Sequence, residues 1–236
     1  MVATIEERIF DIKENIRNAA ERSGRKASDI VLMAVTKTRT LDEILEAAGT
    51  GEISVFGENR VQEAESKILS CPSDIGMEWH LIGHLQRNKA RKAVDLFKCV
   101  QSVDSVRLAE TLDRLCSERD SSMDIFLEIN TSGESSKFGI HPDDAESICL
   151  EIMEKCCFLN INGFMTVGPL SSDEKLVRSS FEQLRLLKEK VEITLGREIP
   201  HLSMGMSSDY KWAIEEGSTM VRIGTSIFGP RDYNRN

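Results

Sequence analysis

Lys37 is the residue whose type and position in this sequence most directly suggest chemistry. It follows a continuous apolar run, Val31–Val35, with only Thr36 between them. A lysine amine that its surroundings keep partly neutral can attack a carbonyl group and form an imine. The same position also suits an ordinary surface lysine at the start of a loop. The run alone therefore leaves both interpretations open.

Two segments near the C-terminus combine glycine with small hydroxyl side chains. They span 203–208 and 224–226, and their residues of interest are Ser203, Gly205, Met206, Ser207, Gly224 and Thr225. Glycine lets backbone amides approach an anion, and hydroxyl groups donate hydrogen bonds to it. Either segment alone is also compatible with a plain helix cap. Together with Lys37, the two segments favour a phosphorylated aldehyde as the ligand.

Arg222 lies two residues before Gly224, inside the apolar run at 220–223. A buried guanidinium is costly unless it meets a partner, so Arg222 either pairs with a buried carboxylate or faces the ligand. An arginine beside the nitrogen of a pyridine ring keeps that nitrogen unprotonated and makes the ring a weak electron sink. If the ligand is pyridoxal 5′-phosphate (PLP), Arg222 therefore predicts weak stabilisation of carbanions.

These residues need a scaffold that gathers the ends of several strands. Short apolar runs alternate with amphipathic segments along the chain, which is typical of parallel strands joined by helices. Strands are predicted at 31–35, 53–56, 79–82, 98–101, 124–129, 161–165, 201–204 and 220–223. The clearest helices are predicted at 106–119, 145–156 and 174–194, and another, capped by Thr4, lies within 1–24.

Eight strands alternating with helices in 236 residues predict an α/β fold, a single (β/α)8 barrel of the TIM type. An open doubly wound sheet is the alternative. No linker divides the chain, so one domain is expected over 1–236, with a helix at 1–24 packed on the barrel and a tail at 230–236. Polar or glycine-rich clusters follow the predicted strands, and a barrel would place them all on its C-terminal rim.

The composition excludes several classes of protein. The 30 basic and 39 acidic side chains give a net charge of −9, which argues against nucleic-acid binding. No run approaches the roughly 20 apolar residues of a membrane span, and the N-terminus is not that of a signal peptide. The six cysteines form no CxxC pair, so reduced thiols, no metal site and a cytoplasmic location are expected.

Motifs along nearly the whole chain resemble one known family. The matching segments lie at 34–38, 56–63, 79–89, 135–139, 163–166, 202–209 and 221–229, and the last two read LSMGMSSD and VRIGTSIFG. They resemble the pyridoxal phosphate homeostasis protein family. The resemblance implies a barrel similar to the N-terminal barrel of alanine racemase, PLP fold type III, without the second β-domain of that enzyme.

The same resemblance implies roles for individual residues. Lys37 is expected to hold PLP as a Schiff base, Arg222 to face the pyridine nitrogen and Asn59 to line the ring. The phosphate is expected at Met206 (through its backbone), Ser207, Gly224 and Thr225, with Ser203 and Lys137 as secondary candidates. Lys137 either assists the phosphate, relays the cofactor or is a plain loop lysine. Two positions stand apart, because Arg60 replaces an expected bulkier aromatic residue and His84 is assigned no catalytic role.

The sequence favours a carrier over an enzyme. A racemase needs a second base on the far face of the ring, which a tyrosine supplies in alanine racemase, yet Tyr210 and Tyr233 are both poorly placed for that role. The expected function is therefore intracellular vitamin B6 homeostasis: a monomer that stores PLP, limits free aldehyde and delivers PLP to PLP-requiring apoenzymes. The alternatives are a PLP-dependent amino-acid racemase or lyase of narrow specificity, and a class I aldolase without a cofactor.

Overall fold

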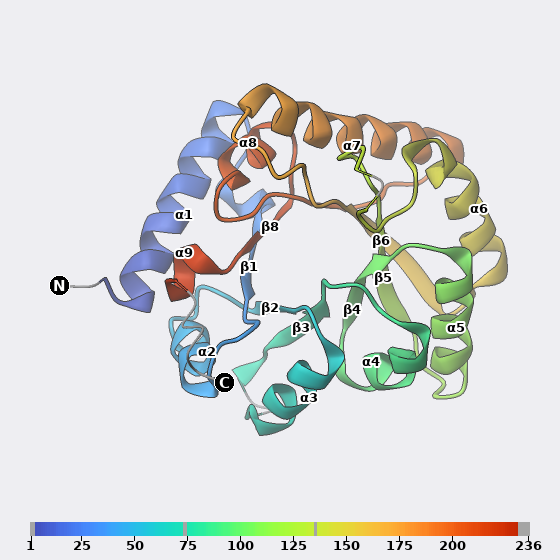
Figure 1. Cartoon of the computed structure of the whole chain (residues 1–236), viewed down its shortest axis with the longest axis horizontal. Helices are drawn as coiled ribbons and strands as arrows, with labels where there is room; N and C mark the ends of the chain where they lie inside the picture. Colours follow the sequence, from blue (N-terminus) through green and yellow to red (C-terminus); the bar gives the residue numbers. More distant parts are fainter. Residues whose placement is uncertain (1–2, 73–74, 135, 231–236) are drawn as a thin grey trace.

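The strands of the computed structural model close into one parallel barrel. The structure describes residues 3–72, 75–134 and 136–230. Neighbouring strands in the barrel follow the order of the sequence from β1 to β8. Because β8 pairs with β1, the first and the last strand meet and close the ring (Figure 1). The predicted (β/α)8 barrel is confirmed, and the open doubly wound sheet is wrong.

The strand bounds lie within two residues of the predicted runs. The strands are β1 (Val31–Val35), β2 (Val55–Glu58), β3 (Glu78–Leu81), β4 (Cys99–Val103), β5 (Met123–Glu128), β6 (Leu159–Met165), β7 (His201–Ser203) and β8 (Met220–Ile223). Apolar runs locate them well because a strand covered by helices outside and by the barrel interior inside is buried on both faces.

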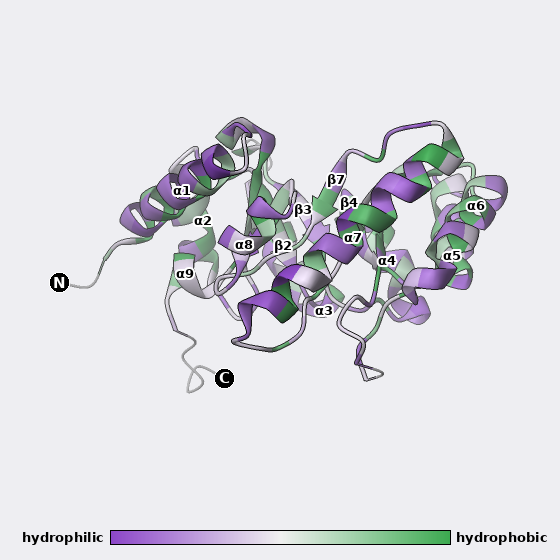
Figure 2. Ribbon diagram, turned by 90° about the horizontal axis from the view of Figure 1, so that it is seen from above, coloured by the Kyte–Doolittle hydropathy of each residue, from purple (hydrophilic) through white to green (hydrophobic). Residues whose placement is uncertain are grey.

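Helices connect the strands and cover the barrel from outside. They are α1 (Ile5–Arg22), α2 (Leu41–Gly49), α3 (Val61–Ser70), α4 (Ala90–Leu96), α5 (Val106–Ser117), α6 (Ala145–Lys155), α7 (Glu174–Leu195), α8 (Tyr210–Glu215) and α9 (Thr225–Phe228). Figure 2 shows hydrophobic and hydrophilic residues alternating along α7, as expected of a helix with one face on the core. The predicted helix at 174–194 is thus confirmed to within one residue.

The first helix packs beside the last two (Figure 1). Thr4 and Glu7 cap α1 reciprocally, each side chain accepting a hydrogen bond from the other residue's backbone amide. The isoleucine stripe of α1 is buried, and Arg8 Nη1 donates to the carbonyl oxygen of Ile227 at 3.1 Å. Helix α1 therefore packs against α9, the helix that follows β8.

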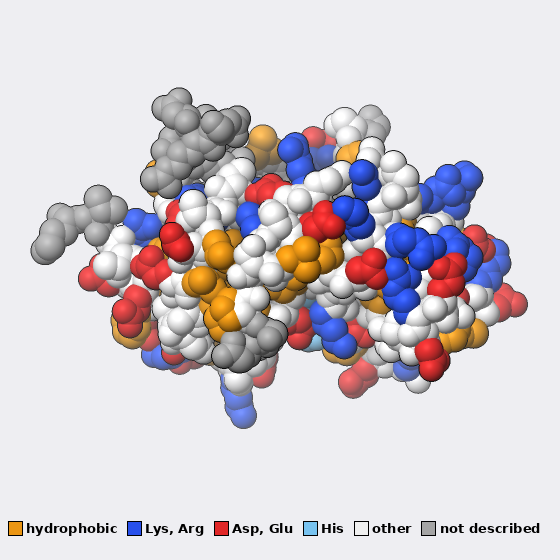
Figure 3. All heavy atoms as spheres, turned by 90° about the horizontal axis from the view of Figure 1, so that it is seen from below, with side chains coloured by type: hydrophobic (Ala, Val, Ile, Leu, Met, Phe, Trp, Pro, Cys, Tyr) orange, Lys and Arg blue, Asp and Glu red, His pale blue; other side chains and the backbone are white. Residues whose placement is uncertain are grey.

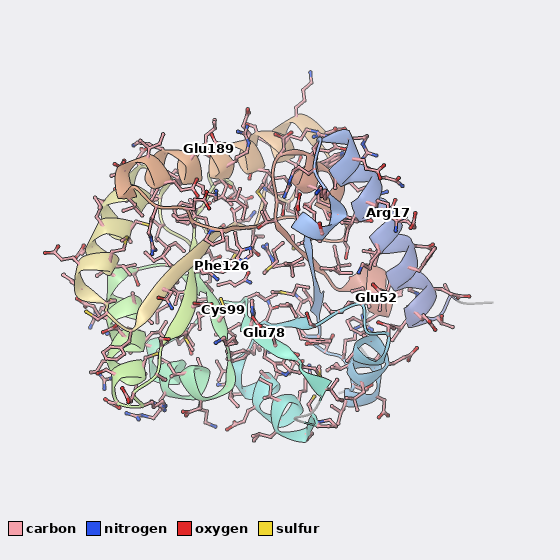
Figure 4. All side chains as sticks on the ribbon, turned by 180° about the vertical axis from the view of Figure 1, so that it is seen from behind. Arg17, Glu52, Glu78, Cys99, Phe126 and Glu189 are labelled. Carbon is pink, nitrogen blue, oxygen red and sulfur yellow. The ribbon has the colours of Figure 1, made fainter. Side chains whose placement is uncertain are left out.

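The barrel interior holds a core of its own, separate from the larger core between strands and helices. It consists of Met33, Cys99, Phe126, Met165 and Met220. Figure 4, seen from behind, shows Cys99 and Phe126 inside the ring of strands. Because side chains alternate along a strand, Glu128 shares the inward face of β5 with Phe126, and Arg222 shares that of β8 with Met220.

The outer surface mixes charges of both signs. On the face shown in Figure 3, acidic and basic side chains lie beside one another. Two ion pairs between neighbouring helices are Arg91–Glu118 at 3.0 Å and Lys92–Glu65 at 2.6 Å. All six cysteines lie in the described part of the chain and are free thiols. Within the described residues, no helix is long and apolar enough to cross a membrane.

Candidate functional site

Arg222 is a buried cation inside the barrel, on β8 next to β1. It is 4% exposed, and its backbone pairs with Met33 of β1. Nη1 donates to the carbonyl oxygen of Ser203 at 2.6 Å and to its Oγ at 2.8 Å, and Nη2 donates to the carbonyl oxygen of Thr166 at 2.8 Å. These bonds use three of the five N–H groups of a guanidinium. The guanidinium is therefore held by β7 and by the residue that follows β6.

Burial lowers the pKa of Arg222 to about 10, while the carboxylates of Glu128 and Asp209 act in the opposite direction. At neutral pH the guanidinium is still charged. A fixed cation of this kind donates hydrogen bonds to a ring nitrogen without giving up its proton. The hydrogen bonds of Arg222 go to neutral groups, so the two carboxylates influence it through space.

Lys37 follows β1 and is half-buried. Its neighbour Thr36 is buried and donates from its backbone amide to the carbonyl oxygen of Gly57 at 3.0 Å. The next residue, Thr38, has a left-handed backbone with φ of 64° and donates its amide to Glu63 Oε1 at 2.5 Å. Groups of β2 and α3 thus hold the backbone on both sides of Lys37.

Lys67, on α3, connects these backbone contacts to a buried carboxylate. Its Nζ donates to the carbonyl oxygen of Thr36 at 2.8 Å and to Oε1 of Glu58 and of Glu63, each at 2.7 Å. Glu58 is fully buried, and burial raises its pKa, against which Lys67 acts. The sequence alone does not predict this pair. Its only signal is a glutamate between Gly57 and Asn59, in a cluster that follows a strand.

Asn59 offers a free acceptor at the rim. Its Oδ1 is buried, and no hydrogen-bond partner is found for it among the described residues. A Cβ on Gly83 would lie 2.3 Å from the backbone oxygen of Asn59, so only glycine lets the loop after β3 pass this close. A buried acceptor without a partner is costly, and a ligand that donates a hydrogen bond would satisfy it.

The two predicted phosphate segments meet beside the end of β1. Ser207 Oγ accepts a hydrogen bond from the backbone amide of Ser226 at 3.3 Å, which joins the loop after β7 to α9. A Cβ on Gly224 would lie 3.3 Å from the backbone oxygen of Val35. Met206 and Thr225 are exposed, and Ser207 and Gly224 are half-buried. The structure thus brings together the four residues expected at the phosphate.

Gly205 sets the path of the first of these loops. Its φ is +95°, and a Cβ there would lie 2.5 Å from Ala213 Cβ and 2.9 Å from Tyr210 Cα. The turn lets the backbone amide of Met206 donate to Asp209 Oδ1 at 2.6 Å. That amide is the group expected at the phosphate, so an anion binding there would compete with the Asp209 carboxylate.

Lys137 and His84 lie on another part of the rim. Lys137 Nζ donates to the carbonyl oxygen of Gly168 at 2.9 Å and pairs with Glu134 at 2.8 Å. His84 stacks on Phe138, with 3.9 Å between ring centroids, and its Nδ1 lies 3.2 Å from Asp104 Oδ2. These contacts tie the loop after β5 to its neighbours. Ser135 of that loop lies outside the described residues.

Glu128, at the end of β5, is a further buried acid that is not among the residues predicted from the sequence. It is 9% exposed, and its Oε2 lacks a hydrogen-bond partner among the described residues. Burial and the nearby Asp104 raise its pKa to about 7, against the charge of Arg222. A glutamate that ends an apolar run at the rim is the sequence signal that points to it.

The remaining positions named from the sequence are Arg60, Tyr210 and Tyr233. Arg60 is exposed and precedes α3. Tyr210 is buried at the start of α8, and burial raises the pKa of its hydroxyl. Tyr233 and the rest of 231–236 lie outside the described residues. Tyr210 is thus a packed side chain of the helix and not a base exposed at the rim.

Comparison with known proteins identifies the family. Residues 9–232 match the family model described as "Alanine racemase, N-terminal domain". A Vibrio alginolyticus protein named pyridoxal phosphate homeostasis protein is 37% identical over 99% of this chain and 100% of its own. The structure of PipY of Synechococcus elongatus PCC7942 with PLP bound is 36% identical, with a TM-score of 0.77 over 91% of this chain and 99% of that one.

Alanine racemase of Clostridium difficile 630 shares the fold at 15% identity, with a TM-score of 0.72. The match covers 94% of this chain and 56% of the racemase chain. This likeness concerns the barrel, whereas the relatives of higher identity match over nearly their full length. The chain therefore belongs to the pyridoxal phosphate homeostasis protein family and is built on the alanine racemase N-terminal domain.

Proposed function

We propose that this chain binds pyridoxal 5′-phosphate at the C-terminal rim of its barrel and serves intracellular vitamin B6 homeostasis. The observation that carries the proposal is the rigid, buried guanidinium of Arg222, held by Ser203 and Thr166 next to the strand that precedes Lys37. The residues fit the cofactor on one further ground, because Asn59 Oδ1 is a buried acceptor that lacks a partner among the described residues.

In this proposal Lys37 Nζ bonds to the aldehyde carbon as a Schiff base, with release of water. Arg222 donates to the pyridine nitrogen and Asn59 lines the ring. The phosphate lies against the joined loops, at the Met206 amide and at Ser207, Gly224 and Thr225, and the two hydroxyl groups donate to its oxygens. Ser203 acts through Arg222. Lys137 stays a secondary candidate, because its contacts hold the loops after β5 and β6.

The same site argues for holding over turnover. PLP supplies an electrophilic aldehyde and an electron-withdrawing ring, and the strength of that ring depends on the proton at its nitrogen. Arg222 keeps its own proton at neutral pH, since its pKa of about 10 is well above that range. Known relatives are likewise named as homeostasis proteins and not as enzymes. Storage, delivery to PLP-requiring apoenzymes and limitation of free aldehyde follow as proposed roles, in a cytoplasmic monomer.

The test is covalent trapping on the full-length protein. We expect the purified protein, mixed with PLP and then dialysed free of unbound PLP, to show the absorbance band of a conjugated imine, at a longer wavelength than that of free PLP. Borohydride reduction should fix the adduct, and peptide mass spectrometry should place it on Lys37. Lys37→Ala should lose the band, whereas Lys137→Ala should keep it. An adduct on another lysine would contradict the proposed site, and sedimentation of the same sample would test the monomer.

A second candidate function, an amino-acid racemase or lyase of narrow specificity, has one observation in its favour. Glu128 is an inward-facing acid with a pKa of about 7, which suits a group that exchanges protons at neutral pH. If Glu128 acts in this way, the PLP-loaded protein should exchange the α-proton of an amino acid with D2O, and Glu128→Gln should abolish the exchange. Exchange at the rate of free PLP would leave the carrier role alone.

A further inference from the structure

A chain of hydrogen bonds crosses the interior of the barrel and ends on Arg222. Arg222 Nη1 donates to Ser203 Oγ at 2.8 Å, and Ser203 Oγ donates to Gln101 Oε1 at 2.7 Å. Gln101 Nε2 lies 2.8 Å from His80 Nδ1, and His80 Nε2 lies 2.7 Å from Glu78 Oε1. The five side chains come from β8, β7, β4 and β3.

This chain of hydrogen bonds connects the candidate ligand site to the opposite, N-terminal end of the barrel. Gln101 and Ser203 are completely buried, and His80 is 4% exposed. Glu78 begins β3, and its side chain is 47% exposed. Figure 4 shows Glu78 near Cys99 at this end of the ring. A cavity of ≈ 120 Å³ opens here, lined by residues that include Glu78, His80, Cys99, Asp124 and His201.

The direction of every bond in the chain follows from chemistry. A guanidinium only donates and an amide oxygen only accepts, so Ser203 Oγ accepts from Arg222 and gives its single proton to Gln101 Oε1. The amide group of Gln101 then faces His80, and Nδ1 of that imidazole can only accept. The proton of the neutral ring is therefore on Nε2, where it donates to Glu78. The orientation of the Gln101 amide thus links the hydrogen bonds of Arg222 to the tautomer of a histidine three links away.

A second contact holds Gln101 in this orientation. Its Nε2 also lies 3.1 Å from Met220 Sδ, a weak acceptor. Reversing the amide would turn Oε1 toward that sulfur and would take from the Ser203 hydroxyl the acceptor of its proton. A proton arriving at His80 Nδ1 would require that reversal. The state of His80 and the bonds of Arg222 are therefore coupled.

We propose that Ser203, Gln101 and His80 are positioning residues that fix the guanidinium of Arg222 in the ligand site and couple it to the proton on His80. The proposal rests on the proposed function, since the consequence for a ligand assumes PLP beside Arg222. Its core, the coupling between Arg222 and His80, concerns the protein alone. A network that only satisfies buried polar groups would fill the same space without this directional coupling.

Two substitutions of Gln101 distinguish positioning from packing. Gln101→Glu keeps an acceptor for Ser203 and offers a carboxylate oxygen to His80. Gln101→Met keeps the volume but removes the acceptor. Positioning predicts that PLP affinity stays within about threefold of the wild type in Gln101→Glu and falls by up to about tenfold in Gln101→Met, the upper range for the loss of one hydrogen bond between neutral groups. Packing predicts the reverse order, because methionine is apolar and glutamate brings a buried charge.

His201→Gln is the matched control. His201 lines the same cavity, but its Nδ1 lies 3.3 Å from Thr219 Oγ1 and it takes no part in the chain. Its PLP affinity and its bound-state absorbance should equal those of the wild type. Affinity in Gln101→Met equal to that of His201→Gln would overturn the proposal, as would a glutamate variant weaker than the methionine variant.

A measurement on PLP-free protein keeps the test valid if a Gln101 variant does not fold or if the wild type binds no PLP. In full-length protein labelled with 15N in histidine, His80 should show a protonated Nε2 and an unprotonated Nδ1. Arg222→Lys should change the His80 nitrogen shifts and leave those of His201 unchanged. If the His80 nitrogen shifts are the same in Arg222→Lys as in the wild type, the proposed coupling is wrong. Absence of the PLP band in the wild type would contradict only the proposed function.

Discussion

At the scale of single residues, two ionisable side chains face the barrel interior from different strands. Glu128 ends β5 and Arg222 lies on β8. Burial raises the pKa of Glu128 and lowers that of Arg222, so in both cases it favours the neutral form. The guanidinium is satisfied by Ser203 and Thr166, whereas one oxygen of Glu128 lacks a partner among the described residues. When both groups are ionised, burial therefore costs more free energy for the Glu128 carboxylate than for the Arg222 guanidinium.

Glu128 should make the stability of the protein depend on pH. Its pKa rises from 4.5 in water to about 7 in the folded protein, so the folded state binds the proton more tightly. The stability from the protonated form is present below about pH 4.5 and is lost as the pH rises through about 7, up to roughly 3 kcal/mol. Glu128→Gln should therefore be about 1 to 3 kcal/mol more stable than wild type at pH 8 and equal to it at pH 4.5.

Urea unfolding of both proteins at the two pH values checks this expectation. Glu198→Gln, at an exposed position, serves as the control for a change in net charge and should show no such difference. Equal gains of Glu128→Gln at both pH values would show that the carboxyl has no proton-linked role in stability.

Arg222 should not tolerate lysine. A lysine is a point charge and cannot donate to Ser203 and Thr166 at once with the geometry of a fork. We expect Arg222→Lys to fold, to lose about 1 to 3 kcal/mol of unfolding free energy and to bind PLP at least about tenfold more weakly. Equilibrium dialysis measures the affinity. Arg197→Lys, at an exposed residue with one bond to the Ile161 oxygen, should change neither quantity, and wild-type affinity in Arg222→Lys would remove this residue from the site.

At the scale of elements, α3 holds the rim next to Lys37 through Lys67. Removing this cation leaves the fully buried Glu58 without its charged partner, which is a costly change. Lys67→Met should therefore destabilise the protein by about 3 kcal/mol or more, and adding Glu58→Gln should recover part of the loss. Lys92→Met breaks a mostly exposed pair with Glu65 and should cost about 1 kcal/mol at most.

Denaturant unfolding of these variants measures the difference. Equal losses in Lys67→Met and Lys92→Met would mean that the contact between α3 and the residues flanking Lys37 contributes no more than a surface pair.

The loop after β7 depends on Gly205. Alanine there would clash with Ala213 and would hold an unfavourable positive φ, so we expect Gly205→Ala to lose about 3 kcal/mol or more and most of its PLP affinity. Gly196 also has a positive φ, +62°, but a Cβ there meets open space. Gly196→Ala should cost about 1 to 2 kcal/mol and leave PLP binding unchanged. Thermal unfolding measures the stability of both variants, and dialysis measures their PLP affinity. Equal PLP affinity in the two variants would show that the loop after β7 does not bind the phosphate.

At the scale of the whole molecule, the sequence predicts the barrel and its rim but not the contacts across its interior. Val31–Val35 and residues 220–223 match β1 and β8 because burial on both faces leaves a plain apolar signal. His80 and Gln101 interrupt such runs with polar side chains, which is a visible hint. Their partners are Glu78 and Ser203, and strand stagger, which no spacing in the sequence reveals, brings these side chains together.

The same limit applies to Glu58 and Lys67. Their contact depends on how α3 lies against β2, and a glutamate and a lysine nine residues apart carry no signal of that packing. The residues assigned from motifs are a different case. Lys37, Ser207 and Gly224 each follow a strand, and a parallel barrel brings all such positions to one face, so knowledge of the fold suffices to gather them.

The pairing of β8 with β1 has a consequence for how the protein is made. During synthesis Lys37 is added well before Arg222 and Gly224, which lie 185 and 187 residues further along the chain. Arg39, two residues after Lys37, donates to the carbonyl oxygens of Phe228 and Gly229 at 3.2 and 2.5 Å, so the contacts of the loop beside the lysine are completed only after these two residues have been added. At about 5 to 20 residues per second, roughly ten seconds or more separate the two events. A growing chain that has not reached β8 thus carries Lys37 without the residues that surround the proposed ligand site. Under the proposed function, only a chain that includes β8 and α9 would retain PLP.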